Sequence, residues 1–279
     1  MEKYIDLHTH STKSDGSMTP KELVNHAKEC GLSAIALTDH DSVSGVKEAV
    51  GEGVKIGVEV VRGIEISVKS ETETHILGYG IDIENQELNE RLSEVRSLRC
   101  TRTLKSIEKL NEAGFDINLC DVEKYAGESI TCRAHIARAM VDKGYVSSVS
   151  EAFDKYLSSG KCGYVNMQYL TPEEGISLIN NAGGKAFAAH LHLMKKSDDG
   201  LFEYLKYLKS IGLSGIEGYY TDYTNDMHEK YMGIAKKLDL AISGGSDFHG
   251  KMKPHIEMGK GRGNLKIPYS VLENIKKLW

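Results

Sequence analysis

The chain has 279 residues, long enough to bury a full hydrophobic core as one large barrel or as a barrel with an insertion. Its formal net charge of −5 argues against a surface that binds polyanions in general, so any recognition of phosphate or nucleotide must be local. No apolar run approaches the length that spans a bilayer, which argues against a membrane protein.

Two further features favour a cytoplasmic location. Met1-Glu2-Lys3 leads straight into the first apolar residues, so we expect no cleaved leader. The five cysteines are scattered and form no C-x-x-C pair, which is typical of reduced thiols rather than disulfides or a thiolate metal site. We therefore expect a cytoplasmic protein with no membrane contact and no obligate protein partner.

Residues 1–82 alternate between strand and helix patterns. A strand over residues 4–10 precedes Thr19-Pro20-Lys21-Glu22, a capping box with proline in the first helical turn. Residues 34–38 form an apolar run of strand length, as expected for a strand covered on both faces. A helix near 42–51 and strands around 55–67 and 74–80 complete a rhythm that indicates a parallel sheet or barrel.

Between about residues 83 and 170 this rhythm gives way to helices. Residues 86–113 are predicted as one long helix ended by Gly114, and its apolar stripe continues from Val95 onto Arg99 and Arg102. Two arginines where the pattern calls for leucine have two explanations. Either the helix leans over a cavity that holds an anion, or it has reached solvent.

A second helix of this region is predicted to begin with Thr131 as its N-cap, followed by Arg133 and His135. The free N–H groups of its first turn, together with Arg133, would make a seat for a phosphate. A further helix is predicted at roughly 149–158. We interpret residues 83–170 as a small α-helical insertion that covers the active site, and residues 1–82 plus 171–279 as the barrel.

The strand and helix rhythm returns with Thr171-Pro172-Glu173-Glu174, a second helix start of the same kind. Strands are predicted near 185–190, 214–219 and 240–243, and helices around 200–211 and 225–238. No low-complexity tract or charge block separates independent domains.

Histidines and carboxylates gather at the ends of the predicted strands. Residues two apart on a strand point the same way, so His8 and His10 can clamp one divalent cation, with Asp15 as an oxygen ligand. Further groups of this kind follow later strands, and in a β/α barrel such strand ends meet at one edge: His40, Glu65, His75, His190, Asp247 and His249. Nitrogen and oxygen ligands without sulfur suit Mn²⁺, Fe²⁺ or Zn²⁺.

These motifs resemble those of the polymerase and histidinol phosphatase (PHP) family. The resemblance rests on motifs that span nearly the whole chain outside the insertion: His8-x-His10, Thr38-Asp39-His40-Asp41, Gly63-x-Glu65, His75, His190 and Ser246-Asp247-x-His249. It implies an α/β fold, a distorted (β/α)7 TIM-like barrel, that binds two or three divalent metal ions.

Carried over by motif, the resemblance implies three groups of ligands: His8, His10, Glu65 and Asp247 for one ion; Asp15, His40 and His190 for a second; Glu65, His75 and His249 for a third. Family members often have proline after the histidine that matches His190. Here Leu191 follows, so His192 stays open as an alternative ligand. Asp247, His249 and Asp15 are the candidate catalytic residues, since Asp247 or His249 can assist proton transfer to the leaving oxygen.

The Asp15-Gly16 turn and the helical insertion resemble one branch of that family. Its members are phosphatases of nucleoside 3′,5′-bisphosphates, and some have 5′→3′ exonuclease activity on short RNA or DNA. The resemblance implies hydrolysis of phosphate monoesters of small nucleotides, either bisphosphates or nucleoside monophosphates. The candidate substrate-binding residues are Arg99, Arg102, Thr131, Arg133 and His135.

Three other functions stay open. A histidinol-phosphate phosphatase is disfavoured by the arginines of the insertion. A metal-dependent amidohydrolase would be favoured by a bridging lysine at a strand end, whereas Lys185 precedes its strand. A non-catalytic nucleotide-binding module would be supported by the loss of a ligand, and none is obviously missing.

Overall fold

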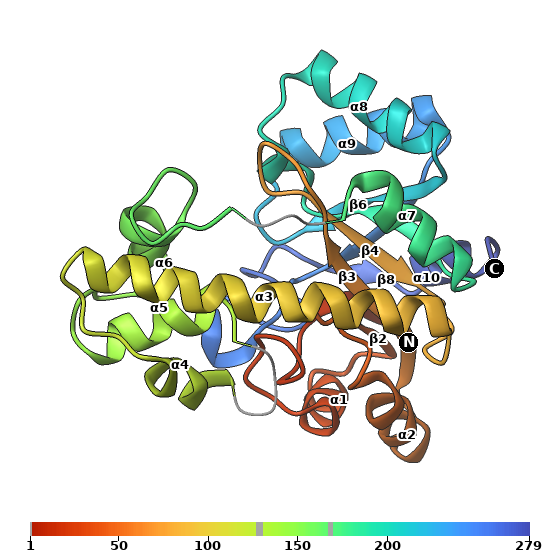
Figure 1. The fold of residues 1–279 in the computed structure, drawn as a ribbon. Coiled ribbons are helices and arrows are strands. Elements are labelled where there is room, and N and C mark those ends of the chain that lie inside the picture. Colours follow the sequence, from red (N-terminus) through yellow and green to blue (C-terminus); the bar gives the residue numbers. More distant parts are fainter. Residues whose placement is uncertain (1, 127–130, 167–169) are drawn as a thin grey trace.

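The computed structural model describes residues 2–126, 131–166 and 170–279, and shows a curved sheet surrounded by helices (Figure 1). Within these residues eight strands lie in the order β7-β6-β5-β4-β3-β2-β1-β8. They are β1 (Tyr4–Thr9), β2 (Ala34–Leu37), β3 (Glu59–Ser67), β4 (His75–Tyr79), β5 (Lys185–Ala188), β6 (Leu213–Tyr220), β7 (Ala241–Gly245) and β8 (Ile267–Pro268).

The sheet is parallel except for two strands. The strand β4 runs antiparallel to both β3 and β5, and the short β8 runs antiparallel to β1. The alternation of strand and helix patterns predicted a parallel sheet or barrel. The direction of β4 differs from this prediction, because too few residues separate β4 from β3 for a parallel crossover. A hairpin is the connection that such a short segment allows.

The segment that follows β7, at one end of the sheet, hydrogen-bonds to β1 and the residue after it, near the other end. These contacts nearly close the barrel. The Asp247 N–H donates to the His8 carbonyl and the His10 N–H donates to the Phe248 carbonyl, each at 2.9 Å. Gly245 permits this approach, because a Cβ atom there would lie 2.3 Å from His8 Cβ. The expected α/β fold, a distorted TIM-like barrel, is confirmed.

Six helices cover the barrel: α1 (Pro20–Glu29), α2 (Val46–Ile56), α7 (Pro172–Asn181), α8 (Asp198–Ser210), α9 (Asn225–Leu238) and α10 (Ser270–Lys276). Both predicted capping boxes are confirmed, since Thr19 and Thr171 each accept the N–H of the glutamate three residues later. The helix expected at 42–51 begins only at Val46, because residues 41–45 form the turn that carries Asp41.

The helix α3 (Gln86–Glu112) belongs to two hydrophobic cores. In its first half, Leu88, Leu92 and Val95 pack into the cluster that also holds sheet residues. In its second half, Ile107 and Leu110 pack into a separate cluster with α4 (Leu119–Ala126), α5 (Arg133–Asp142), α6 (Val149–Ala152) and the π-helical turn Phe153–Leu157. These helices lie to one side of the barrel in Figure 1. We propose that residues 83–170 are an insertion with its own core, joined to the barrel by α3.

The close approach of β7 to β1 predicts that Gly245→Ala is destabilising. The added methyl group must push against the His8 backbone, which we expect to cost about 1–3 kcal/mol and to lower the melting temperature by several degrees. Gly51→Ala, inside α2, is the matched control: nothing lies within 4 Å of its Cβ position, so we expect a gain of about 0.5–1 kcal/mol. Thermal unfolding measures both, and equal melting temperatures would contradict the prediction.

Candidate metal centre

The nine predicted metal ligands converge at one end of the barrel. His8 and Glu65 lie on β1 and β3, and the others follow β1, β2, β5 and β7 directly, except for His75, which begins β4. Because β4 runs antiparallel, its first residue lies at the carboxyl ends of its neighbours. The chain therefore brings imidazoles and carboxylates together from six separate stretches of sequence.

Glu65 lies at the centre of this cluster and is almost fully buried. Its Oε2 faces three imidazole nitrogens: His8 Nε2 at 3.3 Å, His10 Nε2 at 3.3 Å and His40 Nδ1 at 3.1 Å. Its Oε1 faces two others: His75 Nδ1 at 2.8 Å and His190 Nε2 at 2.9 Å. Each oxygen thus faces a different set of nitrogens, which is the arrangement of a carboxylate that bridges two cations.

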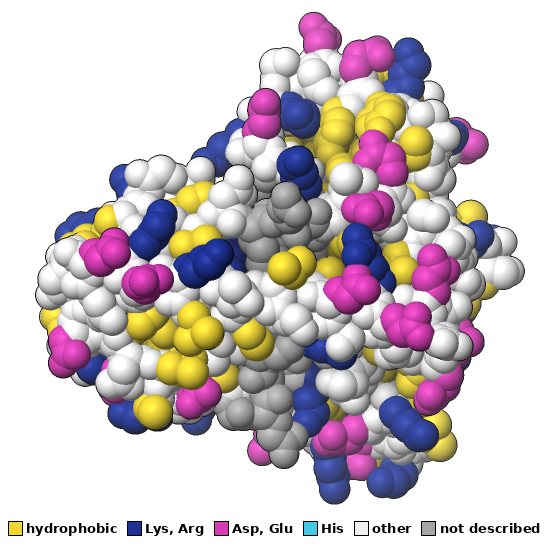
Figure 2. All heavy atoms as spheres, in the orientation of Figure 1, with side chains coloured by type: hydrophobic (Ala, Val, Ile, Leu, Met, Phe, Trp, Pro, Cys, Tyr) yellow, Lys and Arg dark blue, Asp and Glu magenta, His cyan; other side chains and the backbone are white. Residues whose placement is uncertain are grey.

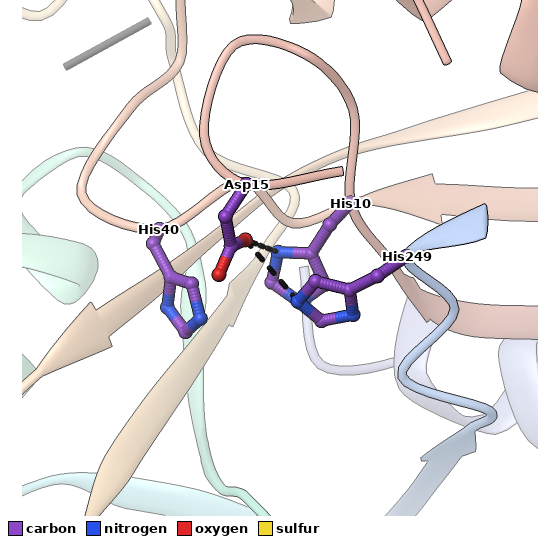
Figure 3. A group of neighbouring side chains, drawn as sticks. All are labelled: His10, Asp15, His40 and His249. Carbon is purple, nitrogen blue, oxygen red and sulfur yellow. Dashed lines mark ion pairs between the residues drawn. The ribbon is translucent and has the colours of Figure 1, made fainter. Parts of the chain in front are cut away.

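A second group forms beside it, from His10, Asp15, His40 and His249 (Figure 3). Asp15 Oδ1 lies 3.1 Å from His249 Nε2 and 3.9 Å from His10 Nδ1. One ligand atom from each of the four residues lies within 4.8 Å of the others. Asp247 completes the cluster, with Oδ1 3.3 Å from His10 Nε2 and 3.6 Å from His8 Nε2.

These distances fit metal coordination. Nitrogen and oxygen ligands bind such ions at about 2.0–2.2 Å, so neighbouring ligand atoms are roughly 3.0–3.6 Å apart. Buried polar atoms are normally hydrogen-bonded, yet several atoms of the cluster have no hydrogen-bond partner among the described residues: His8 Nε2, His10 Nε2, Asp15 Oδ1, His40 Nδ1 and Glu65 Oε2. A cation is the partner that suits this set of donors.

The grouping differs from the one that the resemblance implied. His249 lies with Asp15, and His190 lies with His75 against Glu65, so these two histidines exchange places. The physical reason is the sheet order: β5, which precedes His190, pairs with β4, whereas His249 follows β7 and meets the turn after β1. His192, the alternative to His190, instead packs its ring against Tyr220 at 5.4 Å between centroids.

Strained backbone supports the cluster. Asp41, His190 and Asp247 have positive φ angles of 48°, 27° and 58°, a region that residues with a Cβ atom adopt rarely. Asp41 follows the predicted ligand His40, and His190 and Asp247 are themselves predicted ligands. Such conformations persist where surrounding contacts enforce them, and they concentrate at functional sites.

The buried histidines and carboxylates of the cluster shift one another's pKa values. Burial alone would lower the pKa of His8, but the carboxylates of Glu65, Glu217 and Asp247 outweigh it and hold that pKa well above its usual value. The pKa of His10 rises to about 9, because Asp247 and Glu65 overcome the effect of burial. Burial would raise the pKa of Glu65, but the facing histidines hold it well below its usual value. Without cations, protons on His8 and His10 offset part of the negative charge of the buried carboxylates.

A cavity of about 600 Å³ opens from the cluster toward the helical region. The cluster supplies one wall through Asp15, His40, His75 and His249. The candidate substrate-binding residues Arg99, Arg102, Thr131 and Arg133 line the same cavity. Arg102 is only 8% exposed, so the apolar stripe of α3 continues over a cavity and does not reach solvent there. In contrast, basic and acidic side chains are interspersed over the outer face shown in Figure 2.

The contacts of the candidate substrate-binding residues differ. Arg133 and Arg102 both lie over the Tyr164 ring, with Cζ 5.8 Å and 5.6 Å from its centroid. Arg99 pairs with the buried Asp41 and donates to Ser67 Oγ at 2.9 Å, so it also ties α3 to the barrel.

Thr131 and His135 differ from their predicted arrangement. The N-cap of α5 is Cys132, one residue after Thr131, whose carbonyl accepts the Thr103 hydroxyl. The reason is His135: its buried Nδ1 accepts the Cys132 N–H at 3.2 Å and closes the first turn. His135 is also not among the residues that line the cavity.

Sequence reasoning missed three residues that contact the cluster. Tyr220 donates its hydroxyl to Asp247 Oδ2 at 2.8 Å, and Lys253 Nζ lies 2.7 Å from the same oxygen. Glu217 contacts both His8 and His190. Only Glu217 carried a signal, as a carboxylate within the predicted strand near 214–219.

A barrel with imidazoles and carboxylates converging at its strand ends defines a metal-dependent hydrolase. Residues 6–256 match the family model described as the PHP domain, and the chain belongs to this family. It is a metal-dependent phosphoesterase, as the motifs predicted, and the described clusters supply possible ligands for its ions.

Three relatives illustrate the similarity. The chain is 35% identical over 273 residues to a 5′-3′ exoribonuclease of Haemophilus influenzae, covering 98% of both chains. It is 34% identical over 252 residues to a 3′,5′-nucleoside bisphosphate phosphatase of Chromobacterium violaceum, covering 88% of this chain and 87% of the relative. A solved structure named as an amidohydrolase from Chromobacterium violaceum, with bound sulfate and no metal, superposes with a TM-score of 0.88 at 30% identity, covering 98% of this chain and 96% of its own.

In the part of the chain that the structure describes, no helix combines the length and apolar character needed to cross a bilayer.

The proton balance predicts how pH acts on the metal-free protein. The pKa of His10 is about 9 in the folded state and 6.5 in its ordinary state. Its stabilising contribution is therefore complete below pH 6.5 and is lost as the pH rises toward 9. After chelation, we expect the melting temperature to fall by several degrees across this window. With excess Mn²⁺ the cation replaces the protons, so the fall should disappear. Parallel melting curves with and without Mn²⁺ would contradict the prediction.

Proposed function

We propose that this phosphoesterase hydrolyses phosphate monoesters of small nucleotides, either 3′,5′-bisphosphates or nucleoside monophosphates, and that it also removes nucleotides from the 5′ ends of short oligonucleotides. One observation carries the proposal: a single cavity is lined both by members of the imidazole and carboxylate cluster and by Arg102 and Arg133. A substrate with one phosphate at the cluster and a second anionic group near the arginines fits this arrangement. The names of the two curated relatives support the same substrate class.

We assign the cluster two or three divalent ions, from Mn²⁺, Fe²⁺ and Zn²⁺, because its donors are nitrogen and oxygen without sulfur. Three groups of ligand atoms support this number: His10, Asp15, His40 and His249; His8, His10 and Glu65; His40, Glu65 and His75. His190 contacts Glu65, and Asp247 contacts His10, so both extend these groups. Bound ions would lower the pKa of a water molecule and stabilise negative charge on the attacking and leaving oxygens.

The arginines would hold the second anionic group. Guanidinium groups bind phosphate oxygens in a bidentate manner, and they do so most strongly where water is largely excluded. Arg133 lies over both Phe153 and Tyr164, with Cζ 5.6 Å and 5.8 Å from the ring centroids. Aromatic surface and positive charge thus lie together in the helical wall of the cavity, which suits a nucleotide better than an amino alcohol phosphate.

Proton transfer to the leaving oxygen is assigned to whichever of Asp15 and His249 holds no ion. Both line the cavity, and Asp15 Oδ1 lies 3.1 Å from His249 Nε2. The third candidate, Asp247, directs Oδ1 into the cluster while Tyr220 and Lys253 hold Oδ2. Asp247 therefore acts mainly by holding the cluster together.

An amidohydrolase of this fold would be expected to carry a lysine at the carboxyl end of a strand. Lys185 begins β5, so it lies at the opposite end of that strand from His190. The geometry therefore favours the phosphoesterase.

The function is tested by a panel of substrates assayed with Mn²⁺: AMP, 3′-AMP, 3′,5′-bisphosphoadenosine, histidinol phosphate and a short 5′-phosphorylated RNA. We expect the nucleotides to be hydrolysed, with the bisphosphate faster than AMP or 3′-AMP, because of these three only the bisphosphate offers a second phosphate to the arginines. The Glu65→Gln variant is the inactive control, which should lose bound metal and turnover together. Activity on histidinol phosphate alone would overturn the choice of substrate.

The role of the helical wall is tested by Arg133→Ala. We expect KM for the bisphosphate to rise by about 10-fold or more, since a charge-assisted contact contributes roughly 1.5–3 kcal/mol, with a smaller effect on AMP. Arg138→Ala is the matched control, because Arg138 lies on the same helix, is exposed and contacts Tyr125 outside the cavity. Equal kinetics of the Arg133→Ala variant and the wild type would show that Arg133 is structural.

A further inference from the structure

A fully buried carboxylate lies behind the metal cluster, on a strand without any of the predicted ligands. Glu217 belongs to β6, has no exposed surface, and is not among the residues that line the cavity. A β-bulge between Glu217 and Tyr219 changes the register with β7 at this point. Bulges redirect side chains, and a charge within a buried strand needs a compensating role.

Both oxygens of Glu217 accept a hydrogen bond from a different residue of the cluster. Oε1 lies 2.9 Å from His8 Nδ1, and Oε2 accepts the backbone N–H of His190 at 2.6 Å. His8 lies on β1, and His190 follows β5. One carboxylate therefore joins two parts of the cluster that are far apart in the sequence.

The contact with His8 selects one form of its imidazole. A carboxylate only accepts hydrogen bonds, so His8 Nδ1 must carry the hydrogen that Glu217 receives. In the neutral ring, Nε2 is then the nitrogen with a free lone pair. This nitrogen faces Glu65 Oε2 at 3.3 Å, where the cation is expected.

The contact with His190 holds a strained backbone. With φ of 27° and ψ of 61°, His190 occupies a region that a residue with a Cβ atom rarely adopts and that surrounding contacts must enforce. Its N–H is tied to Glu217 Oε2, and its Nε2 faces Glu65 Oε1 at 2.9 Å. The hydrogen bond thus holds the turn that directs the His190 ring into the cluster.

We propose that Glu217 is a positioning residue of the metal centre, which fixes the Nδ1–H form of His8 and the backbone of His190 so that both Nε2 atoms face Glu65. Glutamine cannot replace it, although it has the same shape. An amide has one acceptor and one donor, so in either orientation its NH₂ group faces one of the two donors. Outer carboxylates of this kind typically change metal affinity by about 10–100-fold.

The inference rests on the proposed metal centre, and the test treats the two separately. Mn²⁺ affinity is measured on purified, chelator-treated protein for the wild type, Glu217→Gln and Glu59→Gln. Glu59 is the matched control, because this glutamate begins β3 at the other end of the barrel, where it contacts Tyr269 and Lys276. We expect Glu217→Gln to bind at least one Mn²⁺ about 10–100-fold more weakly, and Glu59→Gln to bind as the wild type does.

A second measurement needs no variant, so it stands even if Glu217→Gln fails to fold. Nitrogen-15 NMR of histidine in the Zn²⁺-loaded wild type should show His8 with hydrogen on Nδ1 and none on Nε2. The opposite form would overturn the proposal, as would unchanged Mn²⁺ affinity of a folded Glu217→Gln variant. Failure of the wild type to bind Mn²⁺ or Zn²⁺ would instead remove the metal centre itself.

Discussion

The structure depends on one buried carboxylate, Glu65, whose two oxygens face five imidazole nitrogens. Burying a lone charge in a barrel is costly, and the cost is offset only while opposite charges surround it. The raised pKa values of His8, His10 and His190 favour protons on these three rings in the metal-free protein, and bound cations would supply the opposite charge in their place. The same constraint explains why the strand ends must meet: no single strand could place five imidazoles around one side chain.

The barrel and the helical region contribute different groups of side chains to the cavity. The barrel supplies the cluster from strand ends whose backbone is fixed by the sheet. The helical region supplies the arginines and aromatic rings that line the rest of the cavity. The two are coupled through α3, which packs into both cores, and through Arg99, which contacts Asp41 and Ser67 near the cluster. A change in the position of α3 would therefore alter the distance between the cluster and Arg102 or Arg133.

Local patterns made much of this predictable. Capping boxes at Thr19 and Thr171, the apolar runs of the strands and the His8-x-His10 pair all depend on residues close in sequence. The exchange of His190 and His249 was not predictable, because it depends on which strands are neighbours in the sheet. His135 was misjudged, since the same polar side chain can either face a cavity or close its own helix turn. No sequence pattern singled out Lys253, and its role follows only from its position beside Asp247 in the structure.

The distribution of charge is consistent with the polyanionic substrate that we propose for this acidic chain. The net charge is −5, yet the described cavity is lined by six cationic side chains: Lys69, Arg99, Arg102, Arg133, Lys195 and Lys253. Exposed charges on the outside are screened within about 8–10 Å by salt, whereas groups inside a cavity are screened much less. Attraction for phosphate is therefore strong only within the cavity. For the proposed function, this favours a free nucleotide or the end of a single strand, which can enter, over a duplex, which would meet mainly the negative exterior.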